Sequence, residues 1–220
     1  MCWCIHIKVN IMKIYINPLT VNSIKVLLLC NALKITPEFE EIALNKREQR
    51  SEKFLALNPD GKVPVLQVGE VVLTESNAIL QYLANIHNSS LWPVDFSAQA
   101  KVLRLLFWQS NYFNAGLSPL AHRKVVMPFW GFATQELGVE QMAKFHQAVS
   151  ALEAQLKEST FVATESISIA DISFAAFFIF AEKAEMPLGQ YPNTQAWLKT
   201  LAIQPWFSKT KAYLDHILTK

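Results

Sequence analysis

Residues 58–80 read NPDGKVPVLQVGEVVLTESNAIL, and this stretch contains the turn, the strands and the helix start that decide the fold. The run Asn58-Pro59-Asp60-Gly61 is typical of a tight turn, because proline fixes one dihedral and glycine accepts a positive φ. Val63-Pro64-Val65-Leu66 predicts a short buried strand that proline must open, since it donates no hydrogen bond to a sheet. Val71-Val72-Leu73 predicts a second strand, and Thr74-Glu75-Ser76-Asn77 opens a helix with an apolar stripe.

Two interpretations of this stretch are open on its local chemistry alone. It can be an ordinary β-hairpin followed by a capped helix. Alternatively, Val63 offers its backbone N–H and C=O to an extended peptide that lies alongside, as in strand addition. Free N–H groups at the start of the helix near Ser76 would then attract a carboxylate of that peptide.

The composition narrows the class of protein. The chain has 220 residues, of which 51% are hydrophobic and 17% charged, so we expect a globular protein large enough for two small domains. A net charge of +2 predicts no nucleic-acid partner, and no apolar run is long enough to predict a membrane span. Three cysteines and an N-terminus without a signal-peptide pattern indicate a reduced, cytoplasmic location.

The order of the predicted elements divides the chain. Residues 1–11 precede a second methionine, and we expect them to be an extension outside the fold. Residues 12–88 read strand–helix–strand and then strand–strand–helix, with the first two strands parallel because a helix joins them. Residues 89–97 are expected to be a linker. Residues 98–220 predict an all-helical domain, because apolar stripes at helical spacing recur there without a strand pattern.

The helical domain has a predicted centre. Ser168-Ile169-Ala170-Asp171 fits a capping box with Asp in place of Glu. The helix that it opens continues through residues 172–184, ISFAAFFIFAEKA, which are apolar nearly all round, so we expect this helix to be buried. Pro119 and Pro128 are expected to interrupt the helices between residues 115 and 135.

Few patterns in the chain indicate catalysis. The five histidines show no metal-ligand spacing, so we expect no metal. Thr20 and Ser23 place two hydroxyls at the entrance to a helix predicted from about Val21 to Leu33. A helix N-terminus with a hydroxyl donor suits a thiolate, because both stabilise negative charge and so lower the pKa of a thiol. The same two residues can equally be plain helix caps.

Four segments, taken in order, resemble the cytosolic glutathione transferase superfamily: KIYINPLTVNSIKVLL, FLALNPDGKVPVL, LTESNAILQYL and SISIADISF. The resemblance covers residues 12–220, and NP-x-G-K-VP-x-L followed by ES-x-AI is highly specific for that family. It is similar to the theta- and phi-like classes or a related bacterial class. The resemblance implies an α/β thioredoxin-like N-terminal domain, an all-α C-terminal helical bundle and a homodimer.

The resemblance also implies where glutathione would bind. It implies a cis peptide bond before Pro64, and backbone pairing of Val63 with the cysteinyl part of glutathione. Glu75 and Ser76 would hold the γ-glutamyl end, with Ser76 and the helix start receiving its carboxylate.

Further positions follow from the same resemblance. Gln49 and Lys62 match positions that contact the glycyl end of glutathione. In the theta- and phi-like classes a serine occupies the position of Thr20, and Thr20 keeps that hydroxyl. We therefore expect Thr20 to be the catalytic hydrogen-bond donor to the thiol, with Ser23 and Asn22 as fallbacks.

In the family, a second substrate lies between the thiol and the first helices of the C-terminal domain. The residues expected to form that pocket are Trp108, Tyr112, Phe113, His122 and Trp130. An apolar electrophile would suit these side chains, although aromatic residues at helical spacing can equally be core. The resemblance thus implies a glutathione transferase in detoxification, with glutathione as co-substrate and a small hydrophobic electrophile as partner. Glutathione-dependent peroxide reduction and a non-catalytic binding module of the same fold remain alternatives.

Overall fold

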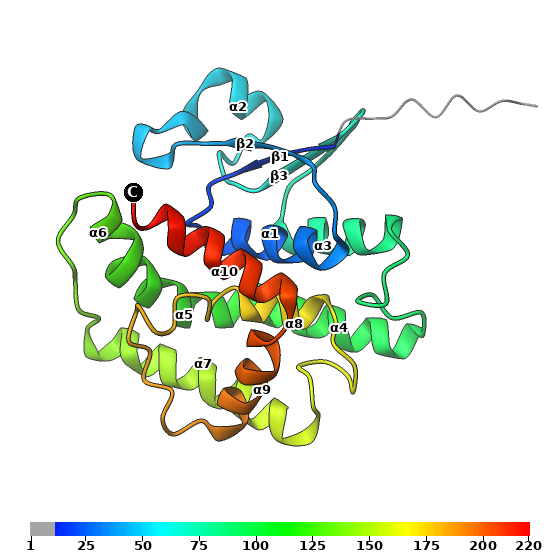
Figure 1. The fold of residues 1–220 in the computed structure, drawn as a ribbon, viewed down its shortest axis with the longest axis vertical. Helices are drawn as coiled ribbons and strands as arrows, with labels where there is room; N and C mark the ends of the chain where they lie inside the picture. Colours follow the sequence, from blue (N-terminus) through cyan, green and yellow to red (C-terminus); the bar gives the residue numbers. More distant parts are fainter. Residues whose placement is uncertain (1–11) are drawn as a thin grey trace, which may run out of the picture.

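The computed structural model describes residues 12–220, which form a four-stranded sheet and a helical domain beside it (Figure 1). The expected extension, residues 1–11, lies outside the described residues. The strands are β1 (Met12–Ile16), β2 (Glu38–Glu41), β3 (Val65–Val68) and β4 (Val71–Leu73), and they lie in the order β2-β1-β3-β4. As predicted, β1 and β2 are parallel, whereas β3 is antiparallel to both of its neighbours.

Helices cover both faces of the sheet. α1 (Val21–Leu33) and α3 (Ser76–Ile86) lie on one face, and α2 (Glu52–Leu57) lies on the other (Figure 1). Two short 3-10 turns, η1 (Leu44–Lys46) and η2 (Glu48–Arg50), precede α2.

Strand β1 shows why both faces need cover. Successive side chains of a strand point to opposite faces of the sheet. Ile14 and Ile16 join the large core that contains α1 and α3, whereas Tyr15 joins a smaller cluster with Phe54 of α2. The rings of Tyr15 and Phe54 meet edge to face with centroids 6.2 Å apart.

The turn predicted at residues 58–61 forms around the buried side chain of Asn58. The Asn58 side-chain amide donates to the carbonyl of Lys62 at 2.8 Å, and the Gly61 N–H donates to the Asn58 carbonyl at 2.9 Å. Gly61 has a φ of +61°, a conformation that glycine adopts without steric cost, which explains why glycine occupies this position. The Val63–Pro64 peptide bond is cis, and β3 begins only after Pro64, because proline has no N–H for the ladder.

The rest of the described chain is helical. Its elements are α4 (Phe96–Trp108), the π-helical segment η3 (Gln109–Phe113), α5 (Asn114–Ala121), the π-helical segment η4 (His122–Val126), α6 (Met127–Phe129), α7 (Val139–Glu158), α8 (Ile169–Ala175), α9 (Pro192–Ala202) and α10 (Pro205–Ile217). The expected linker, residues 89–97, lies between α3 and α4, and its last two residues form the first turn of α4. Within residues 12–220 there is no helix with the length and apolar character that crossing a membrane requires.

The expected interruption at Pro119 was wrong, because the helix continues through it. Pro119 lies inside α5, where its missing N–H leaves the Ala115 carbonyl without a helical partner. Gln141 of α7 supplies the replacement, since its Nε2 donates to the Ala115 carbonyl at 2.7 Å. Pro128 lies in the first turn of α6, where proline is well tolerated.

The capping box of Ser168 and Asp171 forms as predicted and opens α8. The helix is shorter than expected: it ends at Ala175, and residues 176–184 form successive turns. The N–H of Phe178, for example, donates to the Ala175 carbonyl three residues earlier, at 3.0 Å. The aromatic run is still buried at the centre of the domain, so packing from several sides replaces regular helix there.

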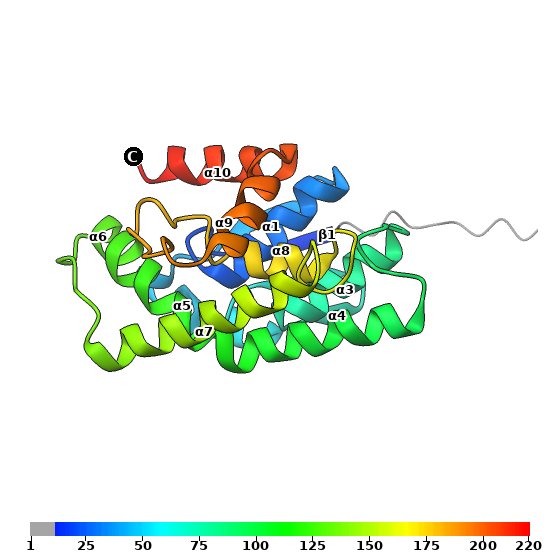
Figure 2. The same cartoon turned by 90° about the horizontal axis from the view of Figure 1, so that it is seen from below.

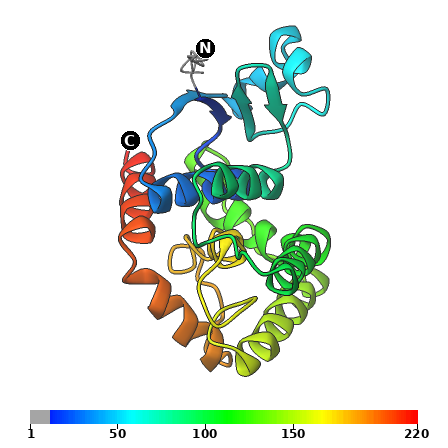
Figure 3. The same cartoon turned by 90° about the vertical axis from the view of Figure 1, so that its right-hand side faces the viewer.

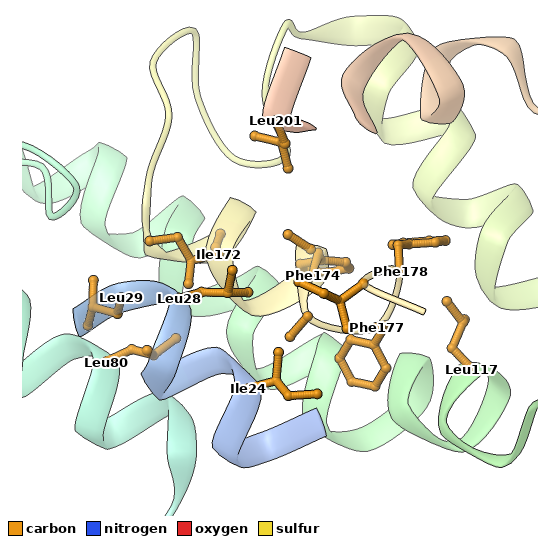
Figure 4. Close-up of a cluster of buried hydrophobic side chains, with 14 of the residues drawn as sticks. Ile24, Leu28, Leu29, Leu80, Leu117, Ile172, Phe174, Phe177, Phe178 and Leu201 are labelled. Atoms are coloured by element: carbon orange, nitrogen blue, oxygen red, sulfur yellow. The ribbon is translucent and has the colours of Figure 1, made fainter. Parts of the chain in front are cut away.

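One hydrophobic core joins the sheet domain to the helical domain. Ile24 and Leu28 of α1 lie against Phe174 and its neighbours (Figure 4). Figure 3 shows α1 and α3 between the sheet and the helical domain, and Figure 2 shows α10 along α1. Because α1 has neighbours on every side, all of its residues from Ser23 to Cys30 are buried. Burial also raises the pKa of the Cys30 thiol to about 12, so Cys30 is an inert core residue, as predicted.

Candidate functional site

Thr20 is the N-cap of α1, and its hydroxyl belongs to a small hydrogen-bonded group. The Ser23 N–H donates to Thr20 Oγ1 at 3.4 Å, and the two hydroxyl oxygens lie 2.8 Å apart. Thr20 Oγ1 also lies 3.1 Å from the carbonyl oxygen of Asn17. Ser23, a fallback for the catalytic donor, is fully buried, and its Oγ accepts from the Asn17 N–H at 3.2 Å. The structure therefore makes Ser23 a supporting group behind Thr20.

The pairing of these hydroxyls determines what Thr20 can do. Each hydroxyl carries one proton, and either can donate to the other. When Ser23 donates to Thr20, the Thr20 proton is free to turn toward a sulfur atom outside α1. A hydroxyl donor and the partial positive charge of the α1 N-terminus both stabilise a thiolate.

A cleft of about 530 Å³ opens in front of Thr20, between the start of α1 and the α5, η4 and α6 region. Its lining residues are Leu19, Thr20, Val21, Asn22, Leu44, Asn114, Ser118, Pro119, Ala121, His122, Arg123, Val126, Trp130 and Phe180. Eight of these fourteen residues are apolar and six carry polar or charged groups. That composition and size suit a small organic molecule.

Only His122 and Trp130, of the five residues expected in the second-substrate pocket, line this cleft. Phe113 is fully buried in the core, and Trp108 packs against it with ring centroids 5.6 Å apart. Tyr112 is 70% exposed and borders a different groove, beside α7. The family resemblance implied the region of the chain that forms the pocket but not the direction of each side chain there, so three of the five expected residues lie elsewhere.

The cleft carries a positive charge on one wall. Partial burial, and then the charge of Arg123, hold the pKa of His122 below its ordinary value. Arg123 donates to the carbonyl of Glu136 at 3.2 Å, and no carboxylate within residues 12–220 forms an ion pair with it. The neighbouring Lys124, in contrast, pairs with both Glu136 and Glu185. Arg123 is thus the cation that the cleft offers to a bound molecule.

A second polar centre lies at the start of α3. Ser76 is 6% exposed, and its Oγ donates to Asn22 Oδ1 at 3.2 Å. Asn22 also lines the cleft beside Thr20, so it connects the two centres. Asn22, the other fallback for the catalytic donor, is therefore placed as a bridge to Ser76.

The structure also describes the other residues predicted to bind a peptide. Glu75 is exposed, and its φ of +64° is a conformation that costs a non-glycine residue about 1–3 kcal/mol. The backbone N–H and C=O of Val63, beside Pro64, take part in none of the hydrogen bonds found within residues 12–220. Lys62 is exposed, whereas Gln49 is half-buried and its Oε1 has no hydrogen-bond partner within the described residues.

Sequence reasoning missed a buried amine next to Ser76. Lys25 of α1 is 1% exposed, and its Nζ donates to Gln109 Oε1 at 2.7 Å and to Ser76 Oγ at 3.3 Å. Burial lowers the pKa of Lys25 to about 7, and the charge of Glu75 acts in the opposite direction. The only signal in the sequence is one lysine inside the otherwise apolar run of residues 24–30, IKVLLLC.

Both halves of the chain match known families. Residues 11–85 match the glutathione S-transferase N-terminal domain, and residues 109–205 match the glutathione S-transferase C-terminal domain. Glutathione S-transferase 3 of Zea mays is 31% identical over 208 residues, which cover 91% of this chain and 93% of the relative.

Solved structures of similar fold agree with these matches. A glutathione S-transferase from Pseudomonas fluorescens has a TM-score of 0.79 and 27% identity, over 89% of this chain and 96% of the other. Glutathione S-transferase-I bound with lactoylglutathione has a TM-score of 0.81 and 26% identity, over 91% of this chain and 98% of the other. In the part of the chain that the structure describes, no cluster of His, Cys, Asp and Glu side chains could hold a metal ion.

Proposed function

The chain belongs to the glutathione S-transferase family, and from that premise we propose that it activates the thiol of glutathione beside Thr20 for attack on a small electrophile. One observation carries the proposal. Thr20 lines the cleft next to Asn22, and Asn22 is hydrogen-bonded to Ser76 at the start of α3. A thiolate site and a carboxylate site therefore lie within reach of one small peptide.

Each group of glutathione has a complementary partner in the proposed site. The backbone of Val63 pairs with the cysteinyl unit, because its N–H and C=O are free within the described chain. Ser76 and the N-terminus of α3 receive the γ-glutamyl carboxylate, and the Glu75 carboxylate faces the ammonium group. Lys62 and Gln49 lie on the side of the glycyl carboxylate, and Lys62 supplies the cation.

The proposed reaction needs a thiolate at neutral pH. The Thr20 hydroxyl donates a hydrogen bond to the glutathione sulfur, which stabilises the thiolate relative to the thiol, and the thiol proton leaves to solvent. A two-unit fall in the pKa of the thiol corresponds to about 2.7 kcal/mol. The thiolate then forms a carbon–sulfur bond with the electrophile in the cleft, and the leaving group departs with the electron pair of the bond that breaks.

Three finer properties belong to the same proposal: the electrophile is small and largely apolar, the protein acts in detoxification in the cytoplasm, and it forms a homodimer. The apolar majority of the cleft lining supports the first. Phe107 and Tyr112, which are 66% and 70% exposed on α4 and η3, support the last, because large exposed apolar side chains often mark an interface.

The decisive experiment is a spectroscopic titration of the glutathione thiol bound to the protein, after a test of retention on immobilised glutathione. We expect retention and a bound thiol whose pKa lies below that of free glutathione. No binding at millimolar glutathione would overturn the proposal. Binding without a lowered thiol pKa would favour the non-catalytic module, and turnover of peroxides but of no electrophile would favour the peroxidase.

A further inference from the structure

We propose that Lys25 is a positioning residue that responds to the γ-glutamyl carboxylate through Ser76, so that glutathione binding is coupled to uptake of a proton by the Lys25 amine. The inference rests on the proposed function, because it takes the carboxylate of glutathione to lie at Ser76. The proposed site then has two proton steps: ionisation of the thiol beside Thr20, and protonation of the buried Lys25 amine behind Ser76.

The first observation is the depth and the chemistry of the Lys25 environment. Lys25 is one of the largest fully buried side chains of the described chain. Its Nζ contacts the amide oxygen of Gln109, the hydroxyl of Ser76 and the ring of Phe177, whose centroid is 5.3 Å away. All of these partners are neutral. No carboxylate in residues 12–220 lies within ion-pair distance of the amine.

The elements around α1 bring few charges close to the Lys25 amine. α1 packs against α3, α8 and α10, and Nζ reaches η3. Besides Lys25 itself, the titratable groups of these elements and their ends are Cys30 and Lys34 at α1, Glu75, Tyr82 and His87 at α3, Tyr112 in η3, Asp171 in α8, and Lys209, Lys211, Tyr213, Asp215 and His216 in α10. Of these, Glu75 is the one whose charge acts on the Lys25 amine. Glu75 is exposed, so solvent screens its effect.

The second observation is that Nζ is hydrogen-bonded to an acceptor that three elements share. Gln109 Oε1 accepts from Lys25 Nζ at 2.7 Å, from Asn77 Nδ2 at 3.0 Å and from Ser173 Oγ at 2.8 Å. These donors come from α1, α3 and α8, so the amide oxygen of Gln109 ties three elements together. The amine cannot swing away to water as a surface lysine does, and it must respond to a nearby charge by changing its protonation.

The coupling follows from electrostatics. A buried ammonium without a counter-ion is costly, which is why the pKa of Lys25 falls to about 7. An anion that binds at Ser76 favours the ammonium and raises that pKa. Linkage then requires the reverse effect, so protonation of Lys25 strengthens binding of the anion. Near neutral pH the site therefore takes up part of a proton when glutathione binds.

The test uses S-methylglutathione, because its blocked thiol cannot release a proton of its own. Its binding is measured by calorimetry at about pH 7.5 in two buffers that differ in ionisation enthalpy, which gives the number of protons exchanged. We expect the wild-type protein to take up roughly half a proton or more, given an amine that titrates near neutrality. We expect Lys25→Met to take up none and to bind more weakly, with an affinity that no longer falls as the pH rises.

Two further variants keep the test interpretable. Lys25→Arg keeps a permanent charge, so its affinity should be restored relative to Lys25→Met and should not depend on pH. Lys101→Met, on the exposed face of α4, should behave as the wild type does.

Wild-type binding without proton uptake would overturn the inference about Lys25 and leave the proposed function standing. Absence of wild-type binding at any pH would instead overturn the proposed function. If Lys25→Met fails to fold, two other measurements test the coupling. One is the number of protons that the wild type takes up, and the other is the same number for Ser76→Ala, which removes the hydroxyl between the carboxylate and Lys25 and should reduce the uptake.

Discussion

The hydroxyl oxygens of Thr20 and Ser23 lie 2.8 Å apart at the N-terminus of α1, with Thr20 on the cleft and Ser23 behind it. This contact supports the proposal that threonine serves at the position where the family resemblance implies a serine. The extra methyl group restricts the rotamers of Thr20, and the buried Ser23 holds its oxygen in one place. The restriction therefore orients the hydroxyl.

Replacing Thr20 with valine tests its role as donor to the thiol. A hydrogen bond to a charged group contributes about 1.5–3 kcal/mol, so the pKa of bound glutathione should rise by about 1–2 units. Turnover at neutral pH should fall by roughly the same factor, about 10- to 100-fold. Ultraviolet titration of the bound thiolate measures the pKa. Thr20→Ser is the matched control and should keep the wild-type value; an unchanged thiol pKa in Thr20→Val would show that another group activates the thiol.

Replacing Ser23 with alanine separates support from catalysis. The variant removes the acceptor of the buried Asn17 N–H, which should lower the free energy of unfolding by about 1–3 kcal/mol. It also leaves the Asn17 carbonyl as the remaining partner for the Thr20 proton, so the thiol pKa should rise by less than in Thr20→Val. Ser118→Ala, which removes another hydroxyl of the cleft, should leave the thiol pKa unchanged. Equal thiol pKa values in Ser23→Ala and the wild type would contradict the supporting role of Ser23.

Local chemistry decided which parts of this structure could be predicted from the sequence. The turn around Asn58 and the capping box of Ser168 and Asp171 depend on residues within a few positions of one another, and both form as predicted. The parallel pairing of β1 and β2 follows from the helix between them. These features depend little on the rest of the chain.

The features that sequence reasoning missed depend on distant contacts. A lysine in a helix is expected at the surface, and Lys25 is buried because α3, α8 and α10 surround α1. The pocket assignments of Tyr112 and Phe113 came from the family resemblance, which gives the region of the chain, whereas packing against distant residues such as Phe174 decides where each ring lies. The early end of α8 at Ala175 likewise reflects packing around the aromatic run and shows no local stop signal.

Arg123 predicts a preference among electrophiles. Because Arg123 lines the cleft and forms no ion pair with a carboxylate of the described chain, an electrophile that carries a carboxylate should bind there. Arg123→Gln should raise KM for a chloronitrobenzoate about fivefold, which corresponds to about 1 kcal/mol for a partly exposed ion pair. KM for the matching neutral chloronitrobenzene should not change. Arg104→Gln, a change outside the cleft, is the control, and equal effects on both substrates would contradict the assignment.

The proposed homodimer has a testable surface. Phe107 and Tyr112 are large, exposed and close in sequence, so burial of their rings would favour association. The double variant Phe107→Glu with Tyr112→Glu should elute as a monomer in size-exclusion chromatography with light scattering, while the wild type elutes as a dimer. Val139→Glu is the control, because Val139 is an apolar residue that is 90% exposed at the start of α7. A wild-type monomer, or a double variant that stays dimeric, would rule out this surface.

The buried amine also predicts how stability depends on pH in the ligand-free protein. Lys25 has a pKa of about 7 in the folded state, against an ordinary value of 10.5. Between these two values the unfolded chain binds more protons than the folded chain, so the free energy of unfolding rises with pH. The limiting slope of this rise is about 1.4 kcal/mol per pH unit. Below pH 7 the amine is protonated in both states, so there the free energy of unfolding is lowest and its dependence on pH through Lys25 disappears.

Urea unfolding of the wild type and Lys25→Met at about pH 7 and about pH 8.5 measures this effect. The wild type should gain about 1–2 kcal/mol relative to Lys25→Met over that interval, because only the wild type loses the strain of a buried ammonium. Saturating S-methylglutathione should flatten the difference, since a bound anion raises the pKa of Lys25 toward its ordinary value. Lys101→Met should follow the wild type. If the free energy of unfolding changes equally with pH in the wild type and in Lys25→Met, the amine does not titrate in this range. That result would also contradict the proposed coupling of Lys25 to glutathione.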